Sequence, residues 1–152
     1  HHPTVPYFST GKNAMPHIGL ITLVVRDYDA AIAFYTDKVG FDLLEDTDLG
    51  DGKRWVVVGP KGATETHVLL AKAKGERQTC IIEDQTGGRV GFFLNTDDFA
   101  RDHARMTNAG VRFLEAPRHE PYGTVAVFED LYGNKWDLLE LKAIPPKNLV
   151  SH

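Results

Sequence analysis

The alternation of apolar and polar positions predicts a strand followed by a helix at the start of the chain. From Gly19 to Val25 the residues are rich in β-branched side chains, as is typical of a strand. The next apolar positions have helical spacing, with Asp27 or Asp29 placed to cap the first turn and Gly40 placed to end the helix. Three short strands should follow, at Phe41–Glu45, Trp55–Val58 and His67–Ala71.

The second half of the sequence predicts the same order of elements again. A strand at Val90–Asn95 leads to a helix at Asp97–Asn108, which Gly110 should end. Three more strands are expected, at Val111–Leu114, Thr124–Phe128 and Lys135–Leu141. Shifting the sequence by 70 positions superposes a few identical residues at caps and turns, among them Gly40 and Gly110. The chain therefore contains an internal repeat of strand, helix and three strands.

This repeat predicts an α+β fold in which two tandem β-α-β-β-β units form a curved mixed sheet, a cup with the helices on its outer face. Strand alternation then assigns side chains to the two faces. The residues expected on the helix side are Ile21, Leu23, Val25, Phe92 and Leu94. Those expected to line the cup are Leu20, Thr22, Val24, Gly91, Phe93 and Asn95.

The repeat also sets the expected domain limits. We expect one domain over residues 15–142, with units at about 16–72 and 89–142. Residues 1–14 begin with two histidines and read as an expression-tag remnant or a disordered extension, and residues 143–152 read as a C-terminal tail. The stretch from Ala73 to Gly88 is long for a connection, which indicates a lid or an interface between two copies.

Composition narrows the choice of partners and location. The chain of 152 residues has a net charge of −4 and scattered basic residues, which argues against a nucleic-acid partner. No apolar run approaches the length of a membrane helix. Cys80 is the only cysteine, so no intrachain disulfide can form, and its apolar neighbours suggest that it is packed. We expect a cytoplasmic protein.

Two stretches resemble the glyoxalase/bleomycin-resistance/extradiol-dioxygenase (vicinal oxygen chelate) superfamily. They are ITLVVRDYDAAIAFYTDKVGFDLLE near the start and VAVFEDLYGNKWDLLEL near the end, the second with an Asp-x-x-Gly-Asn turn before its last strand. The resemblance covers about residues 16–142 and implies the two-unit fold. It leaves the activity open, because the superfamily includes glyoxalases, dioxygenases, transferases, epimerases and drug-sequestering proteins.

The resemblance also implies where a metal would be held. Catalytic members use His, Glu or Gln side chains from the first and last strand of each unit to hold a divalent metal. The corresponding positions here are Leu20, Gly91, a position near Val68 with His67 adjacent, and Asp137. Only Asp137 can bind a metal as aligned, so we expect no metal site and no cofactor. A divalent metal remains the alternative if the strand register differs.

Three residues are candidates for contact with a ligand or for a structural role. Asp137 lies in an apolar strand, where it is either a partly solvated carboxylate or a ligand-binding or proton-transfer group with a raised pKa. His67 faces either the cup or the helix side. Trp55 belongs either to the core or to the aromatic wall of a pocket.

The remaining candidates come from the rim and floor of the expected cup. The loop from Pro117 to Gly123 concentrates polar groups between two prolines, a composition suited either to small-molecule recognition or to a plain connection. Within it, Arg118 could pair with an anion and Tyr122 could donate a hydrogen bond or stack. Phe93 and Asn95 would contact the same ligand from the first strand of the second unit.

Together these features predict a protein, with a homodimer expected, that binds a small organic molecule without the superfamily's catalytic metal. The alternative is an enzyme, either a lyase, an isomerase or an extradiol-type dioxygenase, that uses a metal in a different register or uses Asp137 as a general base. A third possibility is a closed cup and a role played through protein partners.

Overall fold

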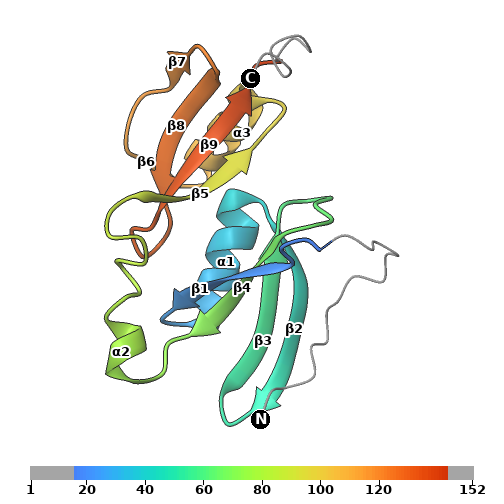
Figure 1. The fold of residues 1–152 in the computed structure, drawn as a ribbon, viewed down its shortest axis with the longest axis vertical. Coiled ribbons are helices and arrows are strands. Elements are labelled where there is room, and N and C mark those ends of the chain that lie inside the picture. The colour runs from blue at the N-terminus through green and yellow to red at the C-terminus, as the bar shows by residue number, and fades with distance from the viewer. Residues whose placement is uncertain (1–15, 144–152) are drawn as a thin grey trace.

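The computed structural model describes residues 16–143, and Figure 1 shows their strands divided between two mixed sheets. The first sheet has the order β1-β4-β3-β2 and contains β1 (Leu20–Val25), β2 (Asp42–Gly50), β3 (Lys53–Gly59) and β4 (His67–Lys72). The second has the order β5-β9-β8-β6, with β7 also paired to β8, and contains β5 (Val90–Asn95), β6 (Arg112–Phe113), β7 (Arg118–Glu120), β8 (Gly123–Glu129) and β9 (Lys135–Leu141). The predicted α+β fold of two repeated units is confirmed.

Each sheet has the same pairing pattern. Its first strand runs parallel to its last strand, and the remaining pairs are antiparallel. The expectations for residues 1–14 and 144–152 lie outside the described part of the chain. None of the helices within residues 16–143 has the length and apolar character that crossing a bilayer requires.

The strands form two separate sheets that share one core, an arrangement that the sequence did not predict. One buried cluster takes side chains from the helix side of both sheets, including Leu23 and Leu70 from the first and Phe128 and Leu138 from the second. Since one face of each sheet lies in this shared core, the other faces both point away from it. We call these the open faces. The sequence predicted one cup shared by the two units. Within one chain the structure instead has two separate open faces, one on each sheet, and both point away from the shared core.

The first helix changes its winding halfway along. It consists of α1 (Tyr28–Ala33) followed by a π-helical turn, η1 (Phe34–Val39). The carboxylate of Asp27 caps its start by accepting from the Ala30 amide at 2.7 Å. Gly40 ends it in the left-handed conformation with φ of 92°, as predicted, because glycine has no Cβ to oppose a positive φ.

The second helix, α3 (Phe99–Asn108), is capped one residue later than the repeat predicted. Asp98 rather than Asp97 accepts from the Arg101 amide, at 3.1 Å. From its cap to the terminating Gly110, the second helix spans one residue fewer than the first does. The π-helical turn of the first unit accommodates the extra residue, since each of its hydrogen bonds spans five residues instead of four.

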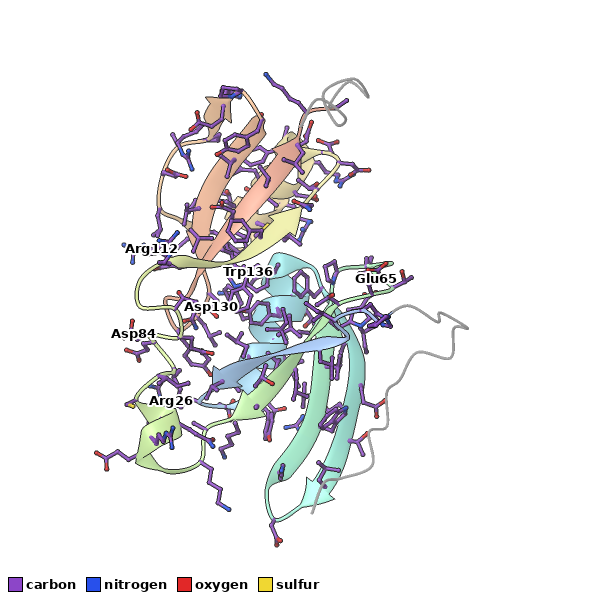
Figure 2. All side chains as sticks on the ribbon, in the orientation of Figure 1. Arg26, Glu65, Asp84, Arg112, Asp130 and Trp136 are labelled. Carbon is purple, nitrogen blue, oxygen red and sulfur yellow. The ribbon has the colours of Figure 1, made fainter. Side chains whose placement is uncertain are left out.

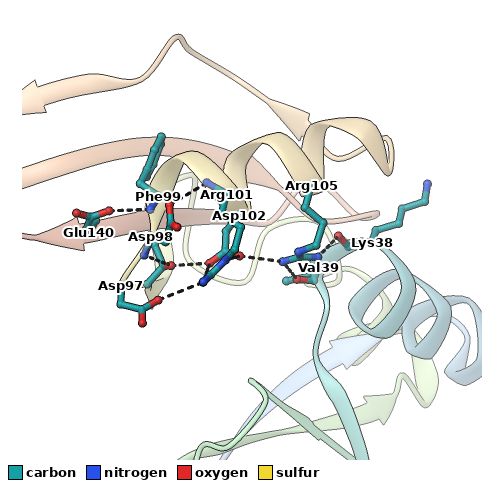
Figure 3. Close-up of polar contacts among 10 residues, drawn as sticks. Lys38, Val39, Asp97, Asp98, Phe99, Arg101, Asp102, Arg105 and Glu140 are labelled. Carbon is teal, nitrogen blue, oxygen red and sulfur yellow. Dashed lines mark hydrogen bonds and ion pairs between the residues drawn. The ribbon is translucent and has the colours of Figure 1, made fainter.

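Helix α3 also ties the two units together (Figure 3). Its first amide, that of Phe99, donates to the carboxylate of Glu140 in β9 at 2.7 Å. At its other end, the guanidinium of Arg105 donates to the backbone carbonyl of Val39 at 2.9 Å. Since Val39 is the last residue of the first helix, the second helix binds its own sheet and the first unit at once.

The connection between the units is an ordered segment. It contains a short helix, α2 (Gly75–Thr79), and then a run of turns in which Ile82 is fully buried. The amide of Gln85 accepts from Val24 N at 3.0 Å and donates to Val24 O at 2.7 Å, so it occupies the free edge of β1. Cys80, expected to be packed, is exposed. The lid and interface roles suggested for this segment remain predictions.

The stretch DTDLGDGK, which lies mainly between the strands predicted at Phe41–Glu45 and Trp55–Val58, is mostly strand. β2 continues through Gly50, and only Asp51 and Gly52 form the turn before β3. β2 pairs with β3 from Asp42 opposite Gly59 to Gly50 opposite Lys53. Backbone pairing with a neighbouring strand outweighs the weak strand propensity of aspartate and glycine.

A buried network joins the two motifs that carried the family resemblance. The Tyr35 hydroxyl, from the first helix, donates to Asp130 Oδ2 at 2.7 Å, and Trp136 Nε1 donates to the Tyr35 hydroxyl at 3.2 Å. Asp130 opens the Asp-x-x-Gly-Asn turn, where its Oδ1 accepts from the amides of Tyr132 and Asn134, each at 2.9 Å. Figure 2 shows Asp130 and Trp136 between the two sheets.

Aromatic packing surrounds this network. The ring centroid of Trp136 lies 5.7 Å from that of Tyr35 and 5.8 Å from that of Phe41, both in the first unit. It also lies 4.6 Å from Phe92 and 5.9 Å from Phe128, both in the second sheet. Aromatic pairs at such separations are mutually stabilising, so Trp136 is the centre of the contact between units.

We predict that Tyr35→Phe lowers the free energy of unfolding by about 1–3 kcal/mol, because Asp130 Oδ2 then loses its shortest hydrogen bond in a buried position. Burial first, and then the charge of Asp130, raises the pKa of Tyr35 well above its usual value, which keeps the hydroxyl protonated as a donor. Urea unfolding measures the change, with Tyr122→Phe at a half-exposed position as the control. Equal losses in the two variants would contradict a special role for the buried bond.

Candidate functional site

The strand registers decide which face each candidate residue occupies. In the first sheet Leu20 pairs with His67 and Thr22 with Leu69, so these four side chains share the open face. Val68, the position assigned from the family resemblance, packs against the core instead. The strand register of the structure therefore differs by one residue from the register that the family alignment implied. His67, rather than Val68, stands beside Leu20 on the open face.

His67 is nevertheless covered. Its side chain is buried, with Nε2 2.8 Å from the carbonyl oxygen of Ala63 in the preceding loop. Its ring also lies against Gly59, where an added Cβ would meet the imidazole Cδ2 at 2.5 Å. This histidine holds the loop before β4 on the end of β3, and the prediction that it contacts a ligand remains untested.

Trp55 lines a cavity that reaches the open face of the first sheet and that Tyr28 and Leu70, from the helix side, also line. The neighbouring Val56 and Val58 are fully buried in the core, and alternation places Trp55 on the opposite face. The cavity has a volume of about 840 Å³. Its lining includes Thr22, Trp55, Leu69, Ala71 and Gln78. Trp55 thus lies in the wall of this cavity, and its contact with a ligand remains a prediction.

The cavity has a basic rim that the sequence analysis missed. Lys53, Lys72 and Lys74 contribute to its lining, with Asp51 as the one carboxylate among the lining residues. Arg54 also lines it, but its guanidinium is held by Asp46 at 2.7 Å and by Asp29 at 2.9 Å. The lysines come from two strand ends far apart in the sequence, so no local pattern indicated that they would gather.

The open face of the second sheet carries most of the predicted site residues. Phe93 pairs with Asp137 and Asn95 with Leu139, so these side chains point to the same side, as expected for Phe93 and Asn95. The ring of Phe93 is 62% exposed, although it lies in the middle of a strand. An exposed aromatic ring in the middle of a strand is available for contact with a ligand or a partner chain.

Arg118 lies on the same face, with its charge already compensated. Its Nε donates to both carboxylate oxygens of Glu115 at 3.0 and 3.1 Å, and its Nη1 donates to Glu120 at 2.5 Å. Tyr122, in the following turn, is half-exposed. The expected anion partner of Arg118 would have to compete with two carboxylates of the chain itself, neither of which the sequence analysis identified.

Asp137 is the least compensated carboxylate of this face. Its Oδ1 is buried and has no hydrogen-bond partner within residues 16–143. Burial, which disfavours the charged form, is the largest cause that raises the pKa of Asp137 above 3.8. The positive charge of Arg118 opposes this rise, and the negative charge of Glu115 adds to it.

The seven predicted site residues therefore fall into two groups. Trp55 and His67 lie on the open face of the first sheet. The second sheet carries the others, namely Phe93, Asn95, Arg118, Asp137 and, in the adjoining turn, Tyr122. Because the open faces point away from the shared core, one chain does not bring the two groups together.

The residues at the family's metal positions do not fit a catalytic metal. The side chains of Leu20 and Gly91 offer no ligand atom to a metal, and His67, which takes the place of Val68 on the open face, is buried with its Nε2 2.8 Å from the carbonyl oxygen of Ala63. Asp137 is a single carboxylate, and within residues 16–143 no three His, Cys, Asp or Glu side chains gather closely enough to hold an ion. A catalytic divalent metal in proteins commonly needs three protein ligands.

Residues 16–138 match the Glyoxalase/Bleomycin resistance protein/Dioxygenase superfamily, and the chain belongs to this family. The match covers both units up to the middle of β9. It therefore includes the Tyr35–Asp130 contact between the two motifs and all seven predicted site residues.

Three individual proteins are similar to this chain over most of its length. A Shewanella frigidimarina protein, described as uncharacterized, is 55% identical over 136 residues, which is 89% of this chain and 98% of the relative. The crystal structure of UcmS2 has a TM-score of 0.72 and 34% identity, covering 82% of this chain and 98% of that one. The structure of TnmS3, an antibiotic binding protein from Streptomyces sp. CB03234, has a TM-score of 0.68 and 34% identity, covering 86% and 99%.

We predict that Asp137→Asn stabilises the fold at about pH 7, by less than about 1 kcal/mol because the site is partly solvated. The pKa of Asp137 is higher in the folded chain than its ordinary value of 3.8. The parent protein therefore loses stability as the pH rises through the interval between these two values, and the variant does not.

Urea unfolding at several pH values checks this prediction. The difference between variant and parent should shrink as the pH is lowered toward 3.8, the ordinary value for Asp137. Asp84→Asn, which alters an exposed carboxylate in the connecting segment, provides the control. A variant less stable than the parent near neutral pH would mean that the chain already compensates the Asp137 charge.

Proposed function

We propose that this protein binds a small, partly apolar organic molecule in the cavity beside Trp55, without a catalytic metal. The observation that carries the proposal is the cavity itself, whose volume of about 840 Å³ falls within the range of small-molecule sites. Its lining combines apolar side chains, such as Trp55 and Leu69, with the charged side chains of the basic rim. The similarity to the antibiotic-binding protein TnmS3 supports the same class of function.

The proposal that no metal takes part rests on the donor set. A divalent metal needs several imidazole or carboxylate ligands that converge on one point. Of the aligned positions only Asp137 provides such a group, and even together with His67 from a facing sheet it would give two ligands where a catalytic metal commonly has three. We accordingly propose sequestration of a ligand, in a cytoplasmic protein, rather than metal-dependent lyase, isomerase or dioxygenase chemistry.

We predict that at least one compound from a panel of antibiotics, catechols and 2-oxoaldehyde–thiol adducts binds, and that its affinity is unchanged after dialysis against a chelator. Calorimetric titration measures the affinity, and elemental analysis of protein purified without chelator should find no stoichiometric Ni, Zn, Mn or Fe. Chelator-sensitive binding would contradict the proposal. Chemical conversion of the bound compound, detected by mass spectrometry, would favour the enzymatic alternative.

The protein should act as a homodimer in which the open face of the first sheet meets the partner's second open face. The two faces have opposite character. The cavity of the first is rimmed by Lys53, Lys72 and Lys74. The second carries the carboxylates of Glu115, Glu120 and Asp137 beside the exposed ring of Phe93, with Arg118 bound to Glu115 and Glu120. Arg112 lies on this face too, paired with Glu129. Such complementarity favours this pairing over contact between like faces.

We predict that Phe93→Asp converts the dimer to monomer, because it places a further negative charge at the apolar centre of the second open face. Sedimentation equilibrium measures the association. Ile81→Asp, which changes an exposed apolar residue of the connecting segment, is the matched control and should leave the dimer intact. Loss of the dimer in the Ile81 variant alone would place the interface on the connecting segment instead.

A further inference from the structure

The described part of the chain contains two buried side-chain polar atoms without a hydrogen-bond partner, Trp55 Nε1 and Asp137 Oδ1. The first belongs to the wall of the cavity. Buried polar groups in folded proteins are nearly always paired, so an unpaired one calls for an explanation. The indole N–H is a donor only, which means that its missing partner is an acceptor.

No neighbouring side chain is placed to satisfy this donor. Thr47 lies directly across from Trp55 on β2, and its hydroxyl is directed to Glu45. The other tryptophan of the chain provides a contrast, because Trp136 Nε1 donates to the Tyr35 hydroxyl. The fold therefore satisfies the indole that holds the core together and leaves the one beside the cavity unsatisfied.

The charges of the cavity point to the same kind of partner. Lys53 precedes Trp55 by two residues on β3 and so lies on the same face, while Lys72 and Lys74 stand at the end of β4. Within residues 16–143 none of these three lysines forms an ion pair, whereas Lys61 outside the cavity pairs with Asp42 at 2.8 Å. Unpaired ammonium groups around a concave surface attract anions.

We propose that the cavity takes a flat, conjugated molecule that presents a carboxylate or carbonyl oxygen to Trp55 Nε1, with a negative charge toward the lysines. The inference rests on the proposed function, since it names the chemical class of ligand for the same cavity. The flat face of the molecule packs on the indole and on Leu69. Because the N–H is covered in the free protein, a small rotation of the indole accompanies binding.

Four matched compounds test this proposal: naphthalene-2-carboxylate, 2-acetylnaphthalene, naphthalene and 2-naphthylmethylammonium. They share one flat ring system and differ in acceptor and charge. The carboxylate should bind about tenfold or more tightly than naphthalene, the ketone should fall between them, and the ammonium compound should bind most weakly. In a ¹H–¹⁵N spectrum the indole signal of Trp55 should move on adding the carboxylate, while that of Trp136 stays in place.

Three variants separate the contributions. Trp55→Phe keeps a flat ring without the N–H, so the preference for carboxylate and ketone over naphthalene should shrink while naphthalene binding persists. The double variant Lys53→Gln, Lys74→Gln should weaken the carboxylate and leave the ketone unchanged. Lys61→Gln removes a charge outside the cavity and should alter neither affinity.

The outcomes distinguish this inference from the proposed function. If neither the naphthalenes nor any compound of the antibiotic panel binds, the proposed function fails. If naphthalene or the ammonium compound binds as tightly as the carboxylate, or if panel compounds bind and the naphthalenes do not, the ligand class is wrong and small-molecule binding stands. An unmoved Trp55 signal in the carboxylate complex also overturns the inference, whether or not the Trp55 variant folds.

Discussion

The hydrogen bond between the Tyr35 hydroxyl and Asp130 Oδ2 is the interaction on which the architecture depends. It joins the helix of the first unit to the turn before the last strand of the second, across 95 residues of sequence. The rings around Trp136 exclude water from it, and the same carboxylate organises its own turn through two amides. A single buried group thereby specifies both a local turn and the docking of the two units.

This docking decides where ligand chemistry can occur. Because the helix sides of both sheets are used in one core, the groups that remain available to a ligand or a partner are those on the two open faces. The first open face has a basic, tryptophan-lined cavity, and the second has carboxylates around an exposed phenylalanine. These are the groups that the proposed binding role uses.

The sequence supported the fold and the face assignments to a large extent. Strand alternation placed Leu23 and Phe92 toward the core and Phe93 and Asn95 on the open side, because the period of two is set by backbone geometry alone. Predictions from local sequence were less reliable where other interactions decided the backbone conformation. Pairing with β3 extended β2 to Gly50, and the first helix continues as a π-helical turn after Ala33. The position expected near Val68 is occupied on the open face by the adjacent His67, because the register of a parallel pair depends on contacts distant in sequence.

The sequence by itself determined the elements, their repeat and the two motifs, since hydrophobic period, capping residues and turn glycines act over a few residues. The tertiary structure alone decided that the candidate residues divide between two faces, that Arg118 is neutralised by Glu115 and Glu120, and that three lysines gather beside Trp55. These outcomes depend on how the two units pack through Tyr35, Asp130 and Trp136, and packing between distant segments leaves no local pattern in the chain.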